Sequence, residues 1–171
     1  MIKSQSPLIS MLRRILIAVL IILVIIQFIH PARNISQRDQ PKNISTSYNT
    51  PPEVKKIFDK ACLDCHSNNT RYLWYFKIQP VDWWLTHHIN EGKQALNFDE
   101  YTNRPLRYQF HKLEEIADQV KEGEMPLGSY TWIHKDAVLT EGEKETIINW
   151  TEKIRAEMKA KYPPDSLRRQ K

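Results

Sequence analysis

The chain has 171 residues, of which 41% are hydrophobic and 26% are charged, and it contains only 4 glycines. This composition excludes collagen-like and low-complexity designs and disfavours glycine-rich phosphate-binding loops. Basic residues outnumber acidic ones by 25 to 20, but three of the basic residues are Lys3, Arg13 and Arg14, in an N-terminal stretch without acids. The remaining excess is too small to predict a nucleic-acid-binding surface, so we expect no nucleic-acid partner.

Residues 15–29 form an uncharged apolar run, ILIAVLIILVIIQFI. At ~1.5 Å per residue the run spans roughly 22 Å as a helix, which is less than the ~30 Å hydrocarbon core. Arg13 and Arg14 would therefore have to snorkel, or the bilayer would have to thin. A cleaved signal peptide needs small residues before the cut, and only Ala32 is small there. We predict an uncleaved signal anchor that holds the protein to membrane lipid.

Residues 31–50 show no apolar periodicity and are rich in Asn, Ser, Gln and Thr. Such residues cannot bury enough apolar surface to offset the entropy of ordering them, so a flexible linker is predicted here. The predicted organisation is a cytoplasmic segment (1–14), a transmembrane signal anchor (15–30), the linker (31–50), a helical domain (51–160) and a polar tail (161–171).

The domain after the linker has apolar residues at three- and four-residue steps and no strand-type alternation, which predicts an all-α fold. A proline in the first turn opens the first pattern, and a glycine ends the third. Thr140 and Glu143 form a capping box at the start of the last. Four helices are predicted, from Pro52 to Cys65, from Val81 to about Gly92, from Pro105 to Gly123, and from Thr140 past Met158.

Residues 62–66, CLDCH, have the C-x-x-C-H spacing of c-type haem attachment. Residues three apart share a helix face, so Cys62 and Cys65 can both reach vinyl groups along one porphyrin edge. His66 lies about 100° further round the helix and can meet the iron from one side. We predict one covalently attached haem c, with these two cysteines as attachment points and His66 as an iron ligand.

Two other uses of the cysteines are weaker. A thioredoxin-like pair needs a βαβ context, and no strands are predicted. A structural zinc site needs a fourth ligand, and three ligands within five residues is poor zinc-finger spacing. The available fourth ligands would be His87, His88, His111 and His134.

The motif and the sequence after it resemble the haem-binding domain family of small bacterial membrane-anchored c-type cytochromes. The resemblance covers about residues 52–155 and rests on the haem motif, a Trp pair, a Gly-Glu-Met-Pro segment and the Leu-Thr start of the final helix, in that order. Leu73 stands where the family commonly has Pro. The resemblance implies a cytochrome c-like helical domain, haem binding and electron transfer. It also implies that the domain lies on the extracytoplasmic (periplasmic) side of the cytoplasmic membrane, where bacteria attach c-type haem.

Met125 is predicted as the second iron ligand. It lies in the Gly-Glu-Met-Pro segment, in a loop between two predicted helices where Pro126 limits backbone freedom. This chain is similar to small monohaem cytochromes c, which have a Met before Pro on the distal side of the haem. A thioether ligand raises the reduction potential of the iron. Two alternatives remain. Met125 could only fill space in the core, or the second ligand could be His87, His88 or His111.

Aromatic residues and histidines after the haem motif are predicted as possible walls of the haem pocket. Two of these, His87 and His88, are adjacent and point about 100° apart on a helix, so at most one can face the iron. Candidate partners for the haem propionates are Arg71, Tyr72 and Lys77, with solvent exposure as the alternative. The possible pocket residues are Trp74, Tyr75, Trp83, Trp84, His87 and His88.

These features predict a membrane-tethered carrier of single electrons rather than an enzyme. Ligation by His66 and Met125 would leave no open coordination position, and no other catalytic motif occurs in the sequence. Redox proteins or a quinol oxidoreductase are the expected partners. The alternatives are a haem-based sensor or peroxidase-like enzyme with an open sixth coordination position, and a module that uses haem only as core.

Overall fold

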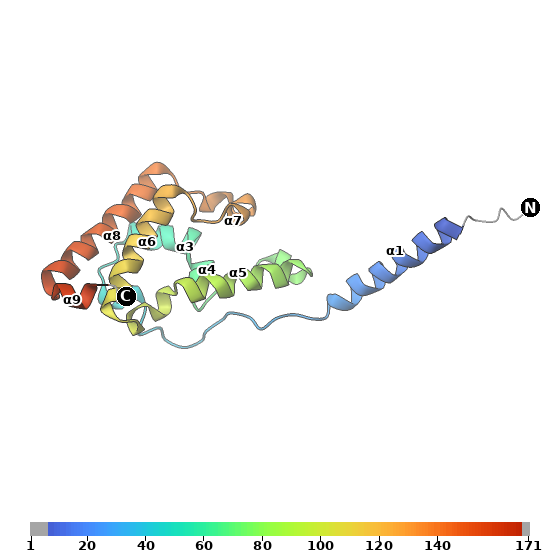
Figure 1. Cartoon of the computed structure of the whole chain (residues 1–171), viewed down its shortest axis with the longest axis horizontal. Helices are drawn as coiled ribbons and strands as arrows, with labels where there is room; N and C mark the ends of the chain where they lie inside the picture. The colour runs from blue at the N-terminus through green and yellow to red at the C-terminus, as the bar shows by residue number, and fades with distance from the viewer. Residues whose placement is uncertain (1–6, 169–171) are drawn as a thin grey trace, which may run out of the picture. The chain divides into compact units, whose positions relative to one another are not determined.

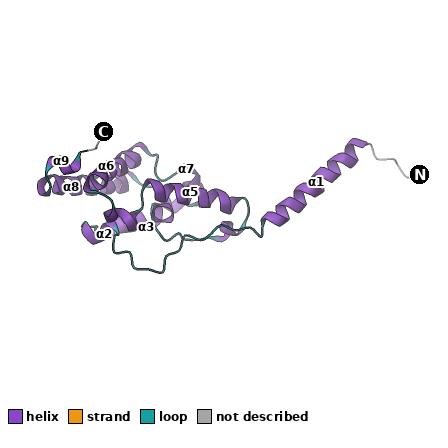
Figure 2. Ribbon diagram, turned by 60° about the horizontal axis from the view of Figure 1, so that its bottom comes forward, coloured by secondary structure: helices purple, strands orange, loops and turns teal. Residues whose placement is uncertain are grey.

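The computed structural model describes residues 7–168, and Figures 1 and 2 show helices and connecting segments throughout this part. Within it, the only strand-type pairing is an isolated bridge between Ile35 and Asn69. The all-α prediction is therefore confirmed. The chain divides into two compact units: an anchor unit of Met1–Arg33 with Arg71–His88, and a core unit of Asn34–Thr70 with Ile89–Lys171.

The anchor unit begins with α1 (Pro7–Ile26), a helix of 20 residues of which none is buried. At ~1.5 Å per residue it is about 30 Å long, the thickness of a bilayer core, and it is apolar enough to cross a membrane. The helix starts before the predicted position because nothing between Pro7 and Arg14 breaks it. Residues 1–6 of the predicted cytoplasmic segment lie outside the described residues.

The remainder of the anchor unit is a 3₁₀ turn, η1 (Trp74–Lys77), and the first half of α5 (Val81–Ala95). The second half of α5 belongs to the core unit. This helix runs past Gly92, where the sequence had predicted its end.

The core unit is built around two long helices, α6 and α8, which lie side by side in both views (Figures 1 and 2). Their buried side chains recur at helical steps, Phe110, Leu113 and Val120 on α6 facing Ile147 and Ile154 on α8. The elements of this unit are α2 (Ile44–Ser47), α3 (Pro52–Ala61), α4 (Leu63–His66), η2 (Phe98–Asn103), α6 (Leu106–Glu122), α7 (Gly128–Ile133), η3 (Lys135–Ala137), α8 (Glu141–Lys161) and α9 (Pro164–Leu167).

The predicted boundaries of the two long helices are confirmed. α6 ends at Gly123, whose φ of 76° is a left-handed conformation that favours glycine. α8 begins with the predicted capping box, in which the Thr140 hydroxyl accepts from the Glu143 backbone N–H and the Glu143 carboxylate accepts from the Thr140 backbone N–H.

The predicted helix from Pro52 to Cys65 is interrupted at Cys62, whose backbone (φ −125°, ψ −44°) ends α3 and precedes α4. The predicted loop between the last two long helices contains α7 and η3. Periodicity could not detect these elements, because each is too short to form a stripe.

The prediction of a flexible linker over residues 31–50 is wrong for the residues that the domain holds in place, among them Asn34, Asn43 and Ile44. Ile44 is only 1% exposed and belongs to the hydrophobic core. The Asn34 side chain donates to the Ser67 carbonyl and the Thr70 hydroxyl, and Asn43 caps α2. Polar side chains are thus ordered by hydrogen bonds to the domain, a form of stabilisation that composition does not reveal.

The predicted polar tail over residues 161–171 also packs against the domain in part. Leu167, in α9, is 6% exposed and belongs to the same hydrophobic core. Burial of this one leucine orders the short helix that carries it. Residues 169–171 lie outside the described residues.

Candidate haem site

The C-x-x-C-H motif forms one tight helical turn at the end of α3. The backbone N–H groups of Cys65 and His66 both donate to the carbonyl oxygen of Cys62, at 3.3 and 3.0 Å. α3 is held in place by buried side chains on its inner face, including Ile57 and Phe58. The position of the motif is therefore fixed by core packing on one side and by its own hydrogen bonds on the other.

The imidazole of His66 is oriented by two backbone carbonyls. Its Nδ1 atom lies 2.9 Å from the carbonyl oxygens of both Gly92 and Leu96. Because a carbonyl oxygen only accepts, Nδ1 carries the proton and Nε2 keeps its lone pair. Desolvation by burial lowers the pKa of His66, which favours the neutral ring. A neutral histidine with Nδ1–H held by backbone carbonyls is the form that ligates metals.

The two cysteine thiols are free and stay protonated at neutral pH. Burial, with a smaller contribution from Cys65, raises the pKa of Cys62 to about 12. Burial, with a smaller contribution from Asp64, raises the pKa of Cys65 to about 11. Reactive redox pairs have lowered thiol pKa values, so this pair lacks the electrostatics of a thioredoxin-like site.

The zinc alternative also lacks support in the structure. Within residues 7–168, no group of three or more His, Cys, Asp and Glu side chains is arranged to hold a metal ion. His134 is buried and stacks on Tyr130, with ring centroids 4.1 Å apart. His111 lies 3.4 Å from the Glu114 carboxylate. Neither histidine therefore completes a zinc site with the motif.

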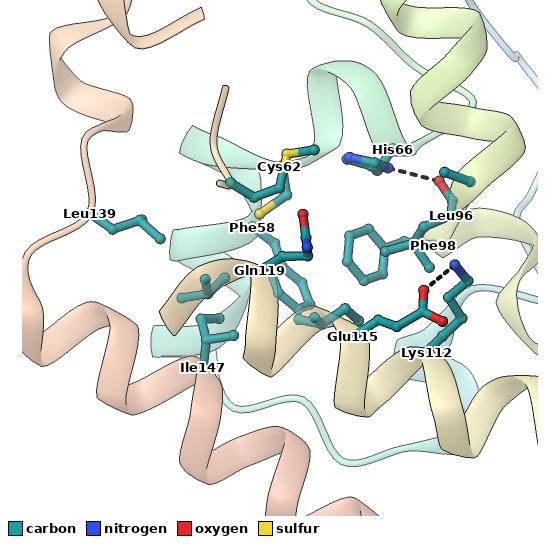
Figure 3. A pocket seen from close by; sticks show the side chains of 14 residues that line it. Phe58, Cys62, His66, Leu96, Phe98, Lys112, Glu115, Gln119, Leu139 and Ile147 are labelled. Atoms are coloured by element: carbon teal, nitrogen blue, oxygen red, sulfur yellow. Dashed lines mark hydrogen bonds and ion pairs between the residues drawn. The ribbon is translucent and has the colours of Figure 1, made fainter. Parts of the chain in front are cut away.

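A cavity of the core unit brings three of the four predicted haem residues together: Cys62, His66 and Met125. Figure 3 shows Cys62 and His66 on one side of it and the ion-paired Lys112 and Glu115 toward another. Most of the lining is apolar, as a porphyrin requires. The other lining residues are Phe58, Ala95, Leu96, Phe98, Ile116, Gln119, Val120, Leu139 and Ile147.

Met125 reaches the cavity because the chain turns back on itself after α6. Gly123 reverses the direction of the backbone, and the Met125 N–H then donates to the Gln119 carbonyl at 3.1 Å. The residue is thus tied to the last turn of α6, next to the cavity wall. Among the lining residues, His66 and Met125 are the pair of types that holds haem iron in cytochromes c.

The donor set of the cavity fits a c-type haem. It supplies a neutral imidazole, a thioether and a thiol within a largely apolar lining, and the second thiol, on Cys65, is one turn away on the same motif. None of the alternatives to Met125 as the second ligand, His87, His88 and His111, lines this cavity.

The six possible pocket residues do not line this cavity. All of them belong to the anchor unit, as do Arg71, Tyr72 and Lys77. Trp74 is 69% exposed, whereas Tyr75 is buried beside Phe76, with ring centroids 5.1 Å apart. The sequence shows that several aromatic side chains lie close together in the chain, but not which part of the structure they pack against. The residues concerned are Trp74, Tyr75, Trp83, Trp84, His87 and His88.

Several site residues were missed by the sequence analysis. Lys112, Glu115 and Gln119 lie at three- and four-residue steps on α6, beside the apolar stripe that was recognised. This helical spacing next to the stripe was the feature of the sequence that could have identified them. Gly92 was read as a helix end but lies inside α5, and a Cβ atom there would come within 2.8 Å of the Cys65 carbonyl oxygen. A glycine inside a helix destabilises the helix by about 1 kcal/mol relative to alanine. A glycine at such a position therefore indicates that another part of the chain packs closely against it.

The fold and the site together define a class of small all-α haem-binding proteins. A model of the haem-binding domain family matches residues 21–153, and the chain therefore belongs to this family. No curated protein and no solved structure matches the chain.

Proposed function

We propose that this protein is a membrane-tethered monohaem c-type cytochrome that transfers single electrons. The observation that carries the proposal is the arrangement at His66, whose Nδ1 is held by two carbonyls while the residue lines a cavity shared with Cys62 and Met125. Family membership supports the haem itself. The proposal adds to this the covalent attachment of the haem, the second iron ligand and the redox role.

Each residue of the site has a distinct part in holding the cofactor. The thiols of Cys62 and Cys65 would form the two thioether bonds, and Nε2 of His66 and the sulfur of Met125 would be the axial ligands. Lys112, which forms an ion pair with Glu115 in this structure, is the one Lys or Arg among the lining residues and would exchange that partner for a propionate. When bound, the haem iron supplies the one-electron chemistry.

An electron carrier fits this site better than an enzyme or a gas sensor. A carrier needs two strong axial ligands and a dry pocket, whereas oxygen, peroxide or gas chemistry needs a vacant position. The cavity lining includes both His66 and Met125. We infer that redox proteins or a quinol oxidoreductase exchange electrons with the domain. We also infer that α1 spans the cytoplasmic membrane and leaves the domain on its periplasmic side.

Covalent attachment is tested by denaturing electrophoresis with a haem peroxidase stain, after expression in bacteria competent for cytochrome c maturation. The full-length band should stain, and the double substitution Cys62→Ala with Cys65→Ala should abolish the stain. Met125→Ala is the matched control, because it removes a proposed ligand but neither thioether, and its band should still stain. A colourless wild-type band would exclude a c-type cytochrome.

Topology is tested with a reporter that is active only after export, fused after Leu167. The reporter should be active, and the protein should remain in the membrane after a high-salt wash. An inactive reporter would contradict the periplasmic placement. Release of a soluble form that starts near residue 31 would show that the anchor is cleaved.

A further inference from the structure

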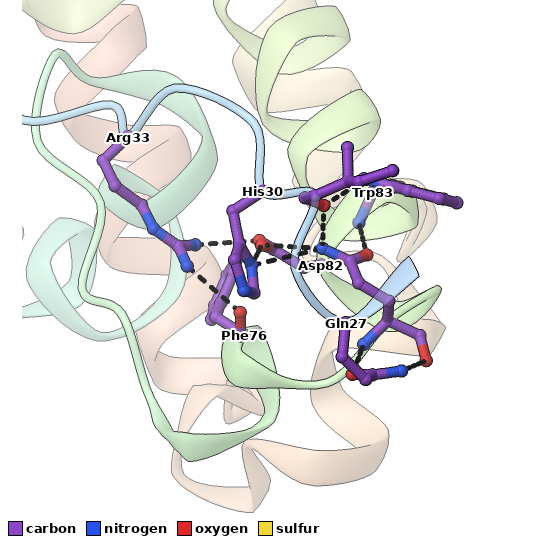
Figure 4. Close-up of polar contacts among 8 residues, drawn as sticks. Gln27, His30, Arg33, Phe76, Asp82 and Trp83 are labelled. Atoms are coloured by element: carbon purple, nitrogen blue, oxygen red, sulfur yellow. Dashed lines mark hydrogen bonds and ion pairs between the residues drawn. The ribbon is translucent and has the colours of Figure 1, made fainter. Parts of the chain in front are cut away.

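The end of α1 is held by the segment that precedes α5. The Gln27 side-chain amide donates to the Gln79 carbonyl at 3.1 Å, and the Gln79 backbone N–H donates to the Gln27 amide oxygen at 2.9 Å (Figure 4). In addition, the Trp83 indole N–H donates to the Ile29 carbonyl at 3.0 Å. The residues just after Ile26 are therefore fixed against residues 79–83 of the same unit.

A buried carboxylate completes this attachment. Asp82 is fully buried and lies 2.9 Å from Nδ1 of His30 and 2.8 Å from Nη1 of Arg33 (Figure 4). Arg33 also donates to the Phe76 carbonyl at 3.1 Å. Asp82 is the sole acidic residue in Gln27–Arg33 and Arg71–His88. These segments therefore expose no carboxylate, while they do expose Lys77.

The same segments expose large apolar side chains. Scattered exposed apolar residues are normal, but a group of them in two short segments beside a membrane helix indicates a contact surface. The indole of Trp83 has its hydrogen-bond partner within the protein, so its ring is free to face an apolar phase. We define the interfacial patch as Phe28 (82% exposed), Ile29 (54%), Trp74 (69%), Ile78 (43%), Trp83 (37%) and Trp84 (47%).

We propose that the interfacial patch lies in the headgroup region of the membrane that α1 crosses and binds phospholipid there. The inference rests on the proposed membrane tethering. The patch is continuous with the end of α1, which places it beside the bilayer. Tryptophan is enriched at the membrane–water boundary because its ring is apolar and its N–H is polar.

The length of α1 favours the same depth. The 20 residues of α1, Pro7–Ile26, rise about 30 Å, which matches the ~30 Å hydrocarbon core. The residues that follow Ile26 are therefore expected at the level of the headgroups rather than far above them. A surface with exposed basic and no exposed acidic side chains is compatible with anionic phospholipids.

The proposal is tested by lipid photo-cross-linking of the full-length protein. The protein is reconstituted into nanodiscs of phosphatidylcholine and phosphatidylglycerol that contain a phospholipid with a diazirine near its glycerol, and adducts are mapped by mass spectrometry. Adducts are expected on α1 and on residues 72–84. Residues 127–138 serve as the comparison, because they also expose Leu127, Trp132, Ile133 and Val138. Adducts there at the level of residues 72–84 would show that exposed apolar side chains are labelled wherever they lie, and would overturn the proposal.

Substitutions make the test specific. Trp74→Glu combined with Trp84→Glu should reduce adducts on residues 72–84 several-fold and leave those on α1 unchanged. Trp132→Glu should change neither. All three tryptophans are exposed, so the helix content measured by circular dichroism should be preserved.

The other outcomes overturn the proposal in distinguishable ways. Adducts on α1 without adducts on residues 72–84 would exclude the patch but leave the tethering intact. A chain with no adducts on α1 would exclude the tethering and the patch together. Cross-linking of residues 72–84 to a second copy of the chain in place of lipid would show that the surface is a protein interface.

Discussion

Gly92 and Cys65 are in direct contact: a Cβ atom on Gly92 would lie 2.8 Å from the Cys65 carbonyl oxygen and 3.2 Å from the Cys65 Cβ. The carbonyl oxygen of the same glycine accepts from Nδ1 of His66. One turn of α5 therefore packs against a proposed attachment cysteine and orients the proposed iron ligand next to it. The distance between α4 and α5 therefore determines both the contact with Cys65 and the orientation of the His66 ring.

Gly92→Ala should disturb this contact. The added methyl group has no room against a backbone carbonyl, so α5 must shift, at a cost of about 1–3 kcal/mol in the free energy of unfolding. Because the Gly92 carbonyl moves with it, we expect less haem-stained protein as well as a lower denaturation midpoint. Both are measured on the protein purified from maturation-competent cells.

Gly142→Ala is the matched control for this change. Gly142 lies in the first turn of α8, and nothing would contact a Cβ atom there within 4 Å. This substitution should be neutral or stabilise the protein by about 0.4–1 kcal/mol. Equal haem loading and equal stability in wild type and Gly92→Ala would contradict the proposed role of the close packing.

Glu143 should make stability depend on pH at acidic values. The Lys60 ammonium, 2.6 Å from the carboxylate, and the Thr140 backbone N–H hold the pKa of Glu143 below its ordinary value of 4.5. A lowered folded-state pKa stabilises the protein above the unfolded-state pKa, and this contribution disappears as the pH falls through the folded-state value.

The substitution Glu143→Gln tests this sign. It should lower the free energy of unfolding by about 0.5–1 kcal/mol at pH 7, because the pair is only partly buried. The gap between wild type and variant should narrow as the pH falls below 4.5 and close below the folded-state pKa of Glu143. Denaturant titrations at pH 7 and at pH 3.5 measure both. A gap between the two proteins that persists unchanged at pH 3.5 would contradict the charge-based explanation.

Asp82→Asn should loosen the attachment between the end of α1 and residues 76–83. The change removes the negative partner of Arg33 and His30 from a buried position, at a cost of about 1–3 kcal/mol. We expect faster limited proteolysis between Gln27 and Arg33 in the membrane-bound protein. Haem staining should be unchanged, because none of these residues lines the cavity. Asp118→Asn, at an exposed position on α6, is the control and should be cleaved like wild type.

Much of the fold could be predicted from the sequence because the long helices carry local signals. α6 and α8 each combine an apolar stripe with a residue that fixes one end, Gly123 or Thr140. The order of residues 34–50 could not be predicted, because it depends on hydrogen bonds to residues distant in the chain. Asn34, for example, is bound to Ser67 and Thr70.

The site shows the same limit. The C-x-x-C-H motif is local and was recognisable, whereas Lys112 and Glu115 became site residues only because the fold brings α6 to the same cavity as Cys62 and His66. The tryptophans of residues 71–88 were predicted as possible pocket walls, because sequence alone indicates aromatic mass and not the surface it faces. Met125 was singled out by its loop context, and the structure places it at the cavity with His66. Its role as a ligand stays a prediction.

Met125→Ala should open the sixth coordination position. A thioether favours ferrous iron, so its loss should lower the reduction potential by on the order of 0.1 V, a fraction of the ~0.8 V that axial ligands span. The reduced variant should bind carbon monoxide, whereas reduced wild type should not. Helix content should change little, because Met125 lies in the loop after α6. Absorption spectra with and without carbon monoxide, together with a redox titration, measure these effects.

Two further substitutions decide whether the sulfur itself is responsible. Met125→His should restore six-coordination and exclude carbon monoxide, at a potential below that of wild type. Met158→Leu alters a buried methionine that does not line the cavity and should leave the spectrum and potential unchanged. If Met125→Ala keeps the wild-type potential, its ligand-to-iron charge-transfer band and its resistance to carbon monoxide, the ligand lies elsewhere. His87, His88 and His111 would then be replaced in turn to find the ligand. A wild-type protein with two histidine ligands would have a lower reduction potential than one with a histidine and a thioether.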